Sequence, residues 1–356
     1  MGIRTTLVAV ATILALGAAQ TQAQDKLKVG FIYVGPIGDH GWSFQHNEGR
    51  LAVEKALGDK VETVFVENVS EGPDAERAIE RLARDGNRLI FTTSFGFMNP
   101  TLKVAAKFPD VKFEHATGFK RAENVSTYSA RFYEGRYVIG QIAAKMSKTG
   151  VAGYVASFPI PEVVRGINAF VLGARSVNPD FKMKVVWVNS WFDPGKEADA
   201  AKALIDQGAD IITQHTDSPA PLQIAAERKI FAFGQATDMH RFAPDYQLTA
   251  IVDNWRDYYI SRAKAVMDGT WKSQDVWGGF AMNMVEMSEF LNMPDDVKAM
   301  ATDTVEKIKS GKIHPFQGPI KRQDGSEVIG AGARLSDEIL LGMNYYVEGV
   351  EGDLPK

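Results

Sequence analysis

The sequence contains no cysteine, so it can form no disulfide and carry no lipid on a cysteine side chain. It also has no apolar run of the roughly 18 residues that a membrane-spanning helix needs. Charge of one sign is not in excess, because 40 Lys and Arg stand against 44 Asp and Glu and leave a net charge of −4. That balance argues against nucleic acid or an anionic membrane surface as the main partner.

Motifs for catalysis and metal binding are missing as well. The chain has no Gly-x-Ser-x-Gly elbow, no His-Glu-x-x-His pair and no phosphate-binding glycine loop. Its six histidines are scattered, and the closest pair, His40 and His46, does not share a helical face. No acidic pair has a neighbour that would tune it as a general acid or base. The sequence therefore predicts a protein that is not an enzyme and needs neither a metal nor a cofactor.

The first 23 residues have the pattern of a cleavable signal peptide. Arg4 gives a positive start, residues 7–19 form a short apolar core, and Thr21-Gln22-Ala23 offers a cleavage site. We expect a mature chain that begins at Gln24. Export without cysteine or a membrane anchor favours the bacterial periplasm.

Strand and helix patterns alternate along the mature chain, as in doubly wound α/β sheets. The pattern runs once to about residue 125 and then restarts, without a Ser/Gly-rich linker. Two consecutive α/β units indicate two lobes, each with a mostly parallel sheet, sharing a cleft. The strands expected from apolar runs are 27–34, 61–66, 88–93, 111–114, 151–157, 184–189, 210–214, 229–234 and 248–252.

The loop from Gly35 to Glu48 is the most informative stretch, because it follows the first strand and carries Asp39 and Trp42. Ligands of doubly wound sheets bind at the carboxyl ends of the strands, where this loop should lie. Further aromatic, hydroxyl and acidic residues follow other strands, namely Ser94, Phe95, Phe158, Trp191, Asp217, Asp238 and Asp253. Trp42 and Trp191 stand in matching loops of the two halves and could close on a flat ligand. Alternatively, Trp42 packs over its own helix, and Phe158 belongs to the contact between the lobes.

The chain resembles the basic membrane protein (BMP) family, the purine nucleoside receptor class of ABC-transporter substrate-binding proteins. The resemblance runs from about residue 27 to the C-terminus. Its opening keeps Asp39 and Glu48-Gly49 and has Trp42 where the family has Phe. The other matching motifs are Ala106-Lys-Phe-Pro-Asp110, Arg131-Phe-Tyr-Glu-Gly135, Ser147-Lys-Thr-Gly150, Ser190-Trp-Phe-Asp-Pro194 and Asp206-Gln-Gly-Ala-Asp210.

The resemblance implies a periplasmic-binding-protein fold of type I with three crossings between the lobes. We expect lobe 1 to hold residues 27–125 and 254–276, and lobe 2 to hold 126–253 and 277–356. The family's two base-stacking rings fall on Trp42 and Trp191, and its ligand-binding carboxylate falls on Asp238. The implied partners are a purine and an inner-membrane permease with its ATPase, and we expect a monomer.

One departure from the family concerns the ligand. The family's lysine near residues 251–254 is absent, and Asp253 stands there. An ionised carboxylate only accepts hydrogen bonds, which favours a free base with an amino group, such as adenine, over a nucleoside. A carboxyl group without such a donor would shift its protonation instead, and Asp253 could also cap the following helix. The sequence leaves room for a nucleoside hydrolase, a sensor that engages a signalling receptor, and a sugar-binding protein.

Overall fold

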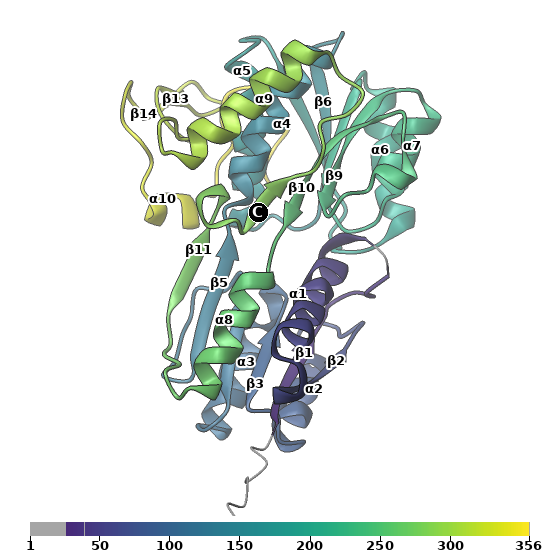
Figure 1. Cartoon of the computed structure of the whole chain (residues 1–356). Coiled ribbons are helices and arrows are strands. Elements are labelled where there is room, and N and C mark those ends of the chain that lie inside the picture. Colours follow the sequence, from purple (N-terminus) through teal and green to yellow (C-terminus); the bar gives the residue numbers. More distant parts are fainter. Residues whose placement is uncertain (1–25, 39, 356) are drawn as a thin grey trace, which may run out of the picture.

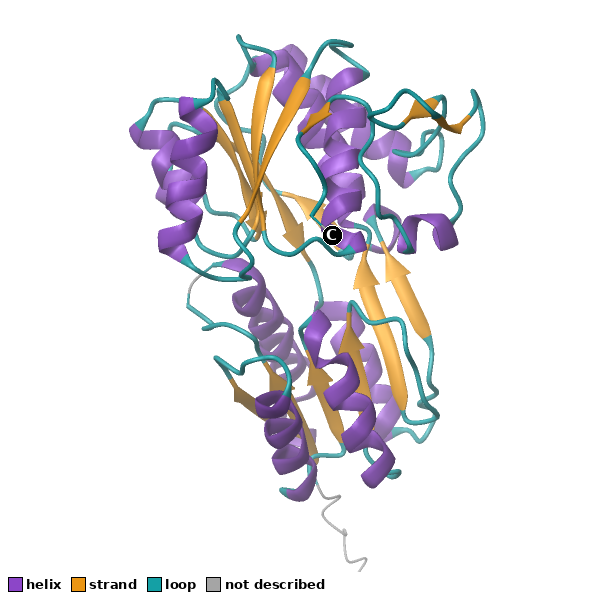
Figure 2. Cartoon of the chain, turned by 180° about the vertical axis from the view of Figure 1, so that it is seen from behind, coloured by secondary structure: helices purple, strands orange, loops and turns teal. Residues whose placement is uncertain are grey.

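The computed structural model describes residues 26–38 and 40–355 as two α/β lobes, one above the other (Figure 1). The expected signal peptide and Asp39 therefore lie outside the described residues. The lower lobe contains most of the first part of the chain together with α8 (Arg256–Met267) and β11 (Asp275–Gly278), and the upper lobe contains the rest. Seen from behind, two neighbouring strands, β5 (Val125–Ala130) and β11, run side by side towards the upper lobe (Figure 2).

The lower lobe has a six-stranded sheet in the order β11-β5-β4-β3-β1-β2, and every neighbouring pair is parallel. Strand β1, which lies between β3 and β2, is buried at five of its six positions, as expected where helices cover both faces of a parallel sheet. The elements of this lobe are β1 (Leu27–Ile32), α1 (Gly41–Leu57), η1 (Gly58–Lys60), β2 (Val61–Val66), α2 (Pro73–Arg84), β3 (Leu89–Thr92), η2 (Phe95–Phe97), α3 (Met98–Lys107), β4 (Lys112–Ala116), β5 (Val125–Ala130), α8 (Arg256–Met267) and β11 (Asp275–Gly278).

The upper lobe has a seven-stranded sheet in the order β12-β10-β9-β8-β6-β7-β15, in which β12 runs antiparallel to β10. A separate hairpin, β13–β14, stands beside it. The elements are α4 (Phe132–Met146), β6 (Val151–Ala156), α5 (Pro161–Arg175), β7 (Lys182–Trp187), α6 (Pro194–Asp206), β8 (Ile211–His215), α7 (Ala220–Glu227), β9 (Phe231–Ala236), η3 (His240–Phe242), β10 (Gln247–Asp253), η4 (Phe280–Met282), β12 (Val285–Met287), α9 (Asp295–Lys309), β13 (Ile320–Lys321), β14 (Glu327–Ile329), α10 (Asp337–Leu341) and β15 (Val350–Glu351).

The chain crosses between the lobes after β5, β10 and β11. The boundary expected at residues 125/126 coincides with the start of β5, which pairs with β4 and β11 in the lower sheet. The first crossing therefore follows Ala130, and the last follows Gly278 rather than residue 276. Because all the parallel strands of a lobe end on the same side, the loops at their carboxyl ends meet between the lobes.

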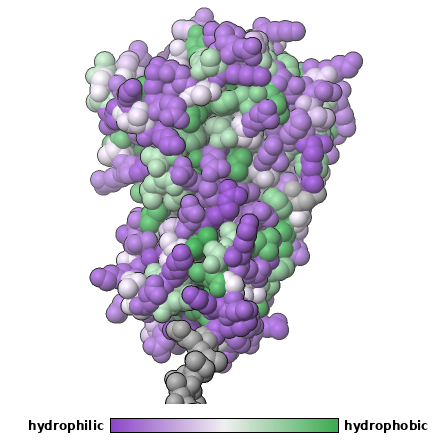
Figure 3. Space-filling view, viewed as in Figure 1, coloured by the Kyte–Doolittle hydropathy of each residue, from purple (hydrophilic) through white to green (hydrophobic). Residues whose placement is uncertain are grey.

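Polar residues cover most of the face seen in Figure 3, and apolar groups are interspersed among them. The part of the chain that the structure describes has no helix long and apolar enough to cross a membrane. Since the carboxyl ends of the parallel strands meet between the lobes, the functional site is expected there.

Candidate functional site

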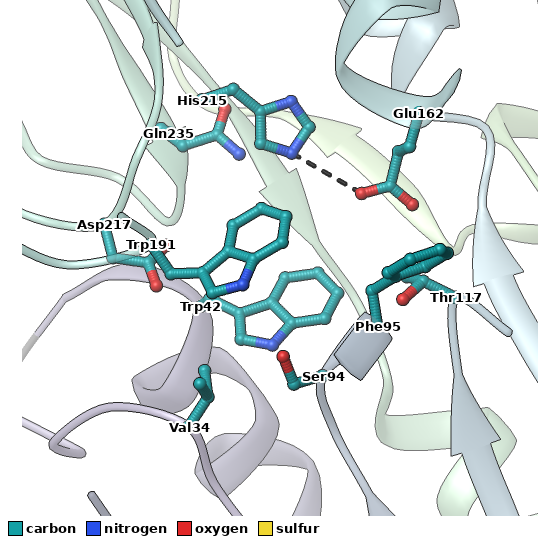
Figure 4. Close-up of a pocket in the computed structure, with 10 residues that line it drawn as sticks. All are labelled: Val34, Trp42, Ser94, Phe95, Thr117, Glu162, Trp191, His215, Asp217 and Gln235. Atoms are coloured by element: carbon teal, nitrogen blue, oxygen red, sulfur yellow. Dashed lines mark ion pairs between the residues drawn. The ribbon is translucent and has the colours of Figure 1, made fainter. Parts of the chain in front are cut away.

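A cavity lies between the lobes, at the carboxyl ends of the strands of both sheets, and takes up about 370 Å³ including its opening to solvent. The lower lobe contributes residues that follow β1, β3 and β4, and the upper lobe contributes residues from α5, β9, the end of β8 and the loops after β7 and β8. The lining residues are Val34, Trp42, Ser94, Phe95, Thr117, Glu162, Trp191, His215, Asp217 and Gln235 (Figure 4).

Trp42 is the second residue of α1 and is held by packing behind it. Its indole N–H donates to the carbonyl oxygen of Thr93 over 2.6 Å. The ring lies edge-on to His46, with centroids 4.3 Å apart, and to Trp255, with centroids 5.7 Å apart. Both predictions for this residue are therefore compatible, because the indole packs on its own helix and still borders the cavity.

Trp191 approaches the same cavity from the loop after β7 in the other lobe. Phe158 lies beside it, with ring centroids 5.1 Å apart, but is not among the lining residues. The indole N–H of Trp191 donates to Glu71 of the lower lobe over 3.2 Å. Glu71 also accepts from the Ser94 hydroxyl over 2.6 Å, so one carboxylate joins the two lobes at the cavity wall.

Asp217 closes the cavity where the N-terminus of α1 meets the upper lobe. Gly41 allows this approach, because a Cβ atom there would lie 2.6 Å from the Asp217 carbonyl oxygen. The Asp217 carboxyl group is enclosed by surrounding atoms, and this burial raises its pKa to about 8, with nearby Glu197 adding to the shift. A protonated carboxyl group can donate as well as accept a hydrogen bond.

His215 and Glu162 form the upper wall, with His215 Nε2 3.5 Å from Glu162 Oε1 (Figure 4). Burial lowers the pKa of His215 and keeps its imidazole neutral at pH 7. Its Nδ1 is buried and has no hydrogen-bond partner among the described residues. His215, Glu162 and Gln235 were not predicted as site residues, although His215 and Gln235 stand at strand ends, the signal used for the others.

Two predicted acids lie elsewhere. Asp238 is exposed and accepts from the backbone N–H of His240 and from Gln247. Asp253 is completely buried at the end of β10, outside the residues that line the cavity, and neither of its oxygens has a partner in residues 26–38 and 40–355. Burial raises the pKa of Asp253 well above its usual range. Its side chain does not cap α8.

Comparison with known proteins identifies the class. The model of the family of PnrA-like ABC transporter substrate-binding proteins matches residues 26–323, so the chain belongs to this family. A purine-binding protein of Brucella abortus is 67% identical over 96% of this chain and 97% of its own. A Haloferax volcanii protein, named provisionally as an ABC transporter glucose-binding protein, is 38% identical over 93% of this chain and 82% of its own.

The fold comparison agrees with this class. A solute-binding protein of an ABC transporter from Aeropyrum pernix superimposes with a TM-score of 0.69 at 20% identity, over 90% of this chain and 100% of its own. The type I periplasmic-binding-protein fold, with two lobes and mostly parallel sheets, is thereby confirmed. Among the described residues, no group of three or more His, Cys, Asp or Glu could hold a metal ion.

Proposed function

We propose that the chain is the periplasmic binding protein of an ABC importer and binds a purine between Trp42 and Trp191. The observation that carries the proposal is that these two indoles, one from each lobe, line a single cavity. Aromatic rings stack on purines with a favourable free energy of about 1–3 kcal/mol per contact. The purine binding for which the Brucella abortus relative is named supports the same ligand class.

A free base with an amino group, adenine, is the favoured ligand. Support for it comes from Glu162, which lines the cavity and can accept a hydrogen bond from an amine. Asp253 does not supply this support, because it is buried outside the lining and its raised pKa favours the neutral acid. Contact with the ligand stays a prediction for four further residues, Asp39, Phe158, Asp238 and Asp253.

A purine nucleoside is the second candidate. A larger hollow adjoins the cavity and shares Phe95, Thr117 and Glu162 with it, so a ribose could extend there. In both cases the ligand leaves unchanged, and the closed, liganded form delivers it to an inner-membrane permease with its ATPase.

A thermal-unfolding panel of adenine, hypoxanthine, adenosine and glucose tests this function. A ligand that binds only the folded state raises stability by about 2.7 kcal/mol at a hundredfold excess over its Kd. We expect adenine to raise the unfolding temperature most, adenosine less, and glucose not at all. A rise with glucose and none with any purine would contradict the proposal and favour a sugar importer.

A further inference from the structure

Gln235 lies in β9 and is one of the cavity's most buried polar side chains, at 4% exposure. Its amide has one oxygen, which accepts hydrogen bonds, and one NH₂ group, which donates them. The oxygen Oε1 accepts from the Nη2 group of Arg136. The amide nitrogen makes no hydrogen bond within the part of the chain that the structure describes.

Arg136 determines which way this amide faces. The residue lies in α4, is completely buried, and donates through Nη1 to the Thr213 hydroxyl over 3.2 Å. A guanidinium group only donates, so the atom of Gln235 that faces Arg136 must be the oxygen. The NH₂ group then points to the side of the two indoles, as Figure 4 shows. A flipped amide would set donors against donors and leave the buried guanidinium without its acceptor, which is costly.

The other polar groups of the cavity complement this donor. Glu162 and Asp217 present carboxyl groups from α5 and from the loop after β8. A ligand that offers an acceptor to Gln235 and a donor to the Glu162 carboxyl group can pair with both. Adenine has this arrangement on two edges, where the exocyclic amine lies beside a ring nitrogen.

We propose that Gln235 determines ligand specificity by donating a hydrogen bond from its amide N–H to a ring nitrogen of the purine, and that Arg136 is the positioning residue that holds the amide in this orientation. The inference rests on the proposed function and adds to it the polar group that recognises a ring nitrogen of the ligand. A ring nitrogen is the acceptor because adenine has no carbonyl oxygen.

Calorimetry with adenine and its 1-deaza, 3-deaza and 7-deaza analogues tests the inference, because each analogue replaces one ring nitrogen with C–H. We expect the parent protein to bind one analogue about tenfold to a hundredfold more weakly than adenine, since the Gln235 donor is then left without a partner. Gln235→Glu keeps an acceptor for Arg136 but removes the donor. This variant should bind adenine more weakly and no longer distinguish adenine from that analogue.

Gln223→Glu is the matched control, because Gln223 is exposed on α7 of the same lobe. It should leave every affinity unchanged. If Gln235→Glu weakens all four ligands by one common factor, Gln235 has only a structural role and the inference is wrong. The inference also fails if the parent binds adenine and all three analogues equally. If the parent binds no purine, the proposed function itself fails, and the inference with it.

Arg136→Met tests the positioning role. Without the guanidinium the Gln235 amide is free to turn. The ratio of the affinity for adenine to the affinity for the discriminating analogue should therefore fall towards one, while binding persists. Thermal unfolding establishes whether this variant folds. Full retention of the preference in a folded variant would exclude a positioning role for Arg136, and the Gln235→Glu comparison decides the donor role independently.

Discussion

Trp42 and Trp191 border one cavity but are held in different ways. Trp42 packs against His46, Trp255 and Phe132, so it is part of the wall before any ligand arrives. Trp191 contacts Phe158 and His215 and is linked to the lower lobe through Glu71. Removing Trp42 would therefore disturb its ring contacts inside the lower lobe as well as the site, whereas removing Trp191 also removes the hydrogen bond to Glu71.

Trp191→Ala should weaken adenine binding by about tenfold to a hundredfold, because one stacking contact worth about 1–3 kcal/mol is lost. Trp191→Phe keeps an aromatic face but loses the N–H that donates to Glu71, so it should recover only part of the affinity. Calorimetry of the two variants beside the parent measures both effects. If the alanine variant binds adenine as tightly as the parent, Trp191 does not stack on the ligand.

Asp217 should make stability depend on pH. Its pKa is about 8 in the folded protein and about 3.8 in an ordinary setting, so the folded state binds the proton more tightly. Its stabilising contribution is complete below the ordinary pKa and is lost as pH rises towards 8. Asp217→Asn removes the titrating group. The free energy of unfolding of this variant should therefore rise relative to that of the parent as the pH increases from 4 to 8. Urea unfolding of the ligand-free proteins measures this difference, and a constant difference across the range would show that Asp217 titrates normally.

At the scale of elements, the N-terminus of α1 depends on the absence of a side chain at Gly41. The residue has a φ of +83° and faces the Asp217 carbonyl of the other lobe. Gly58, after the C-terminus of the same helix, also has a positive φ of +53° but has nothing within 4 Å of its Cβ position. Substituting the two glycines in turn therefore distinguishes the effect of backbone strain from the effect of an obstructed contact between the lobes.

Gly41→Ala should weaken adenine binding, because the added methyl group obstructs the approach of the lobes; an obstruction that costs the closed form about 1.4 kcal/mol lowers affinity tenfold. Gly58→Ala should lower stability by about 1–3 kcal/mol, since a φ of +53° with a ψ of −129° is strained for alanine, and leave affinity unchanged. Equal affinities of the parent and Gly41→Ala would mean that α1 does not have to meet the Asp217 loop for binding.

The loop after β2 contributes the second link between the lobes. Glu71→Ala removes the acceptor of the Trp191 indole N–H and of the Ser94 hydroxyl, and each such hydrogen bond is worth about 0.5–1.5 kcal/mol. We expect adenine binding to weaken about threefold to tenfold. Glu76→Ala is the control, because Glu76 pairs with Lys103 and Lys107 within the same lobe. Similar affinities for the two variants would exclude a closing role for Glu71.

At the scale of the whole molecule, alternating strands and helices were sufficient to predict two α/β lobes. The assignment of strands to sheets was harder. Strand β5 follows the point where the pattern restarts, yet it pairs in the lower sheet, and apolar periodicity contains no information about pairing partners. Short strands such as β12 and β15 were not predicted, because tertiary contacts rather than local sequence create them.

The same limit applies to the site. The expectation that ligands bind at the carboxyl ends of the strands indicated Trp42, Ser94, Phe95, Trp191 and Asp217, which the fold brings around one cavity. Gln235 was missed although it stands near the end of β9, because whether a strand residue faces the cleft depends on the pleat of the strand. Glu162 was missed because it lies in a helix. The same expectation also pointed to Asp238, whose carboxylate accepts hydrogen bonds from its own turn and from Gln247.

Calorimetric titration of the ligand-free protein with adenine and, separately, with glucose tests the central claim most directly. We predict saturable binding of about one adenine per chain and no heat of binding with glucose, because two indoles from opposite lobes form a slot for a flat base. Saturation with glucose and no response to adenine would contradict the assignment of a purine to this cleft.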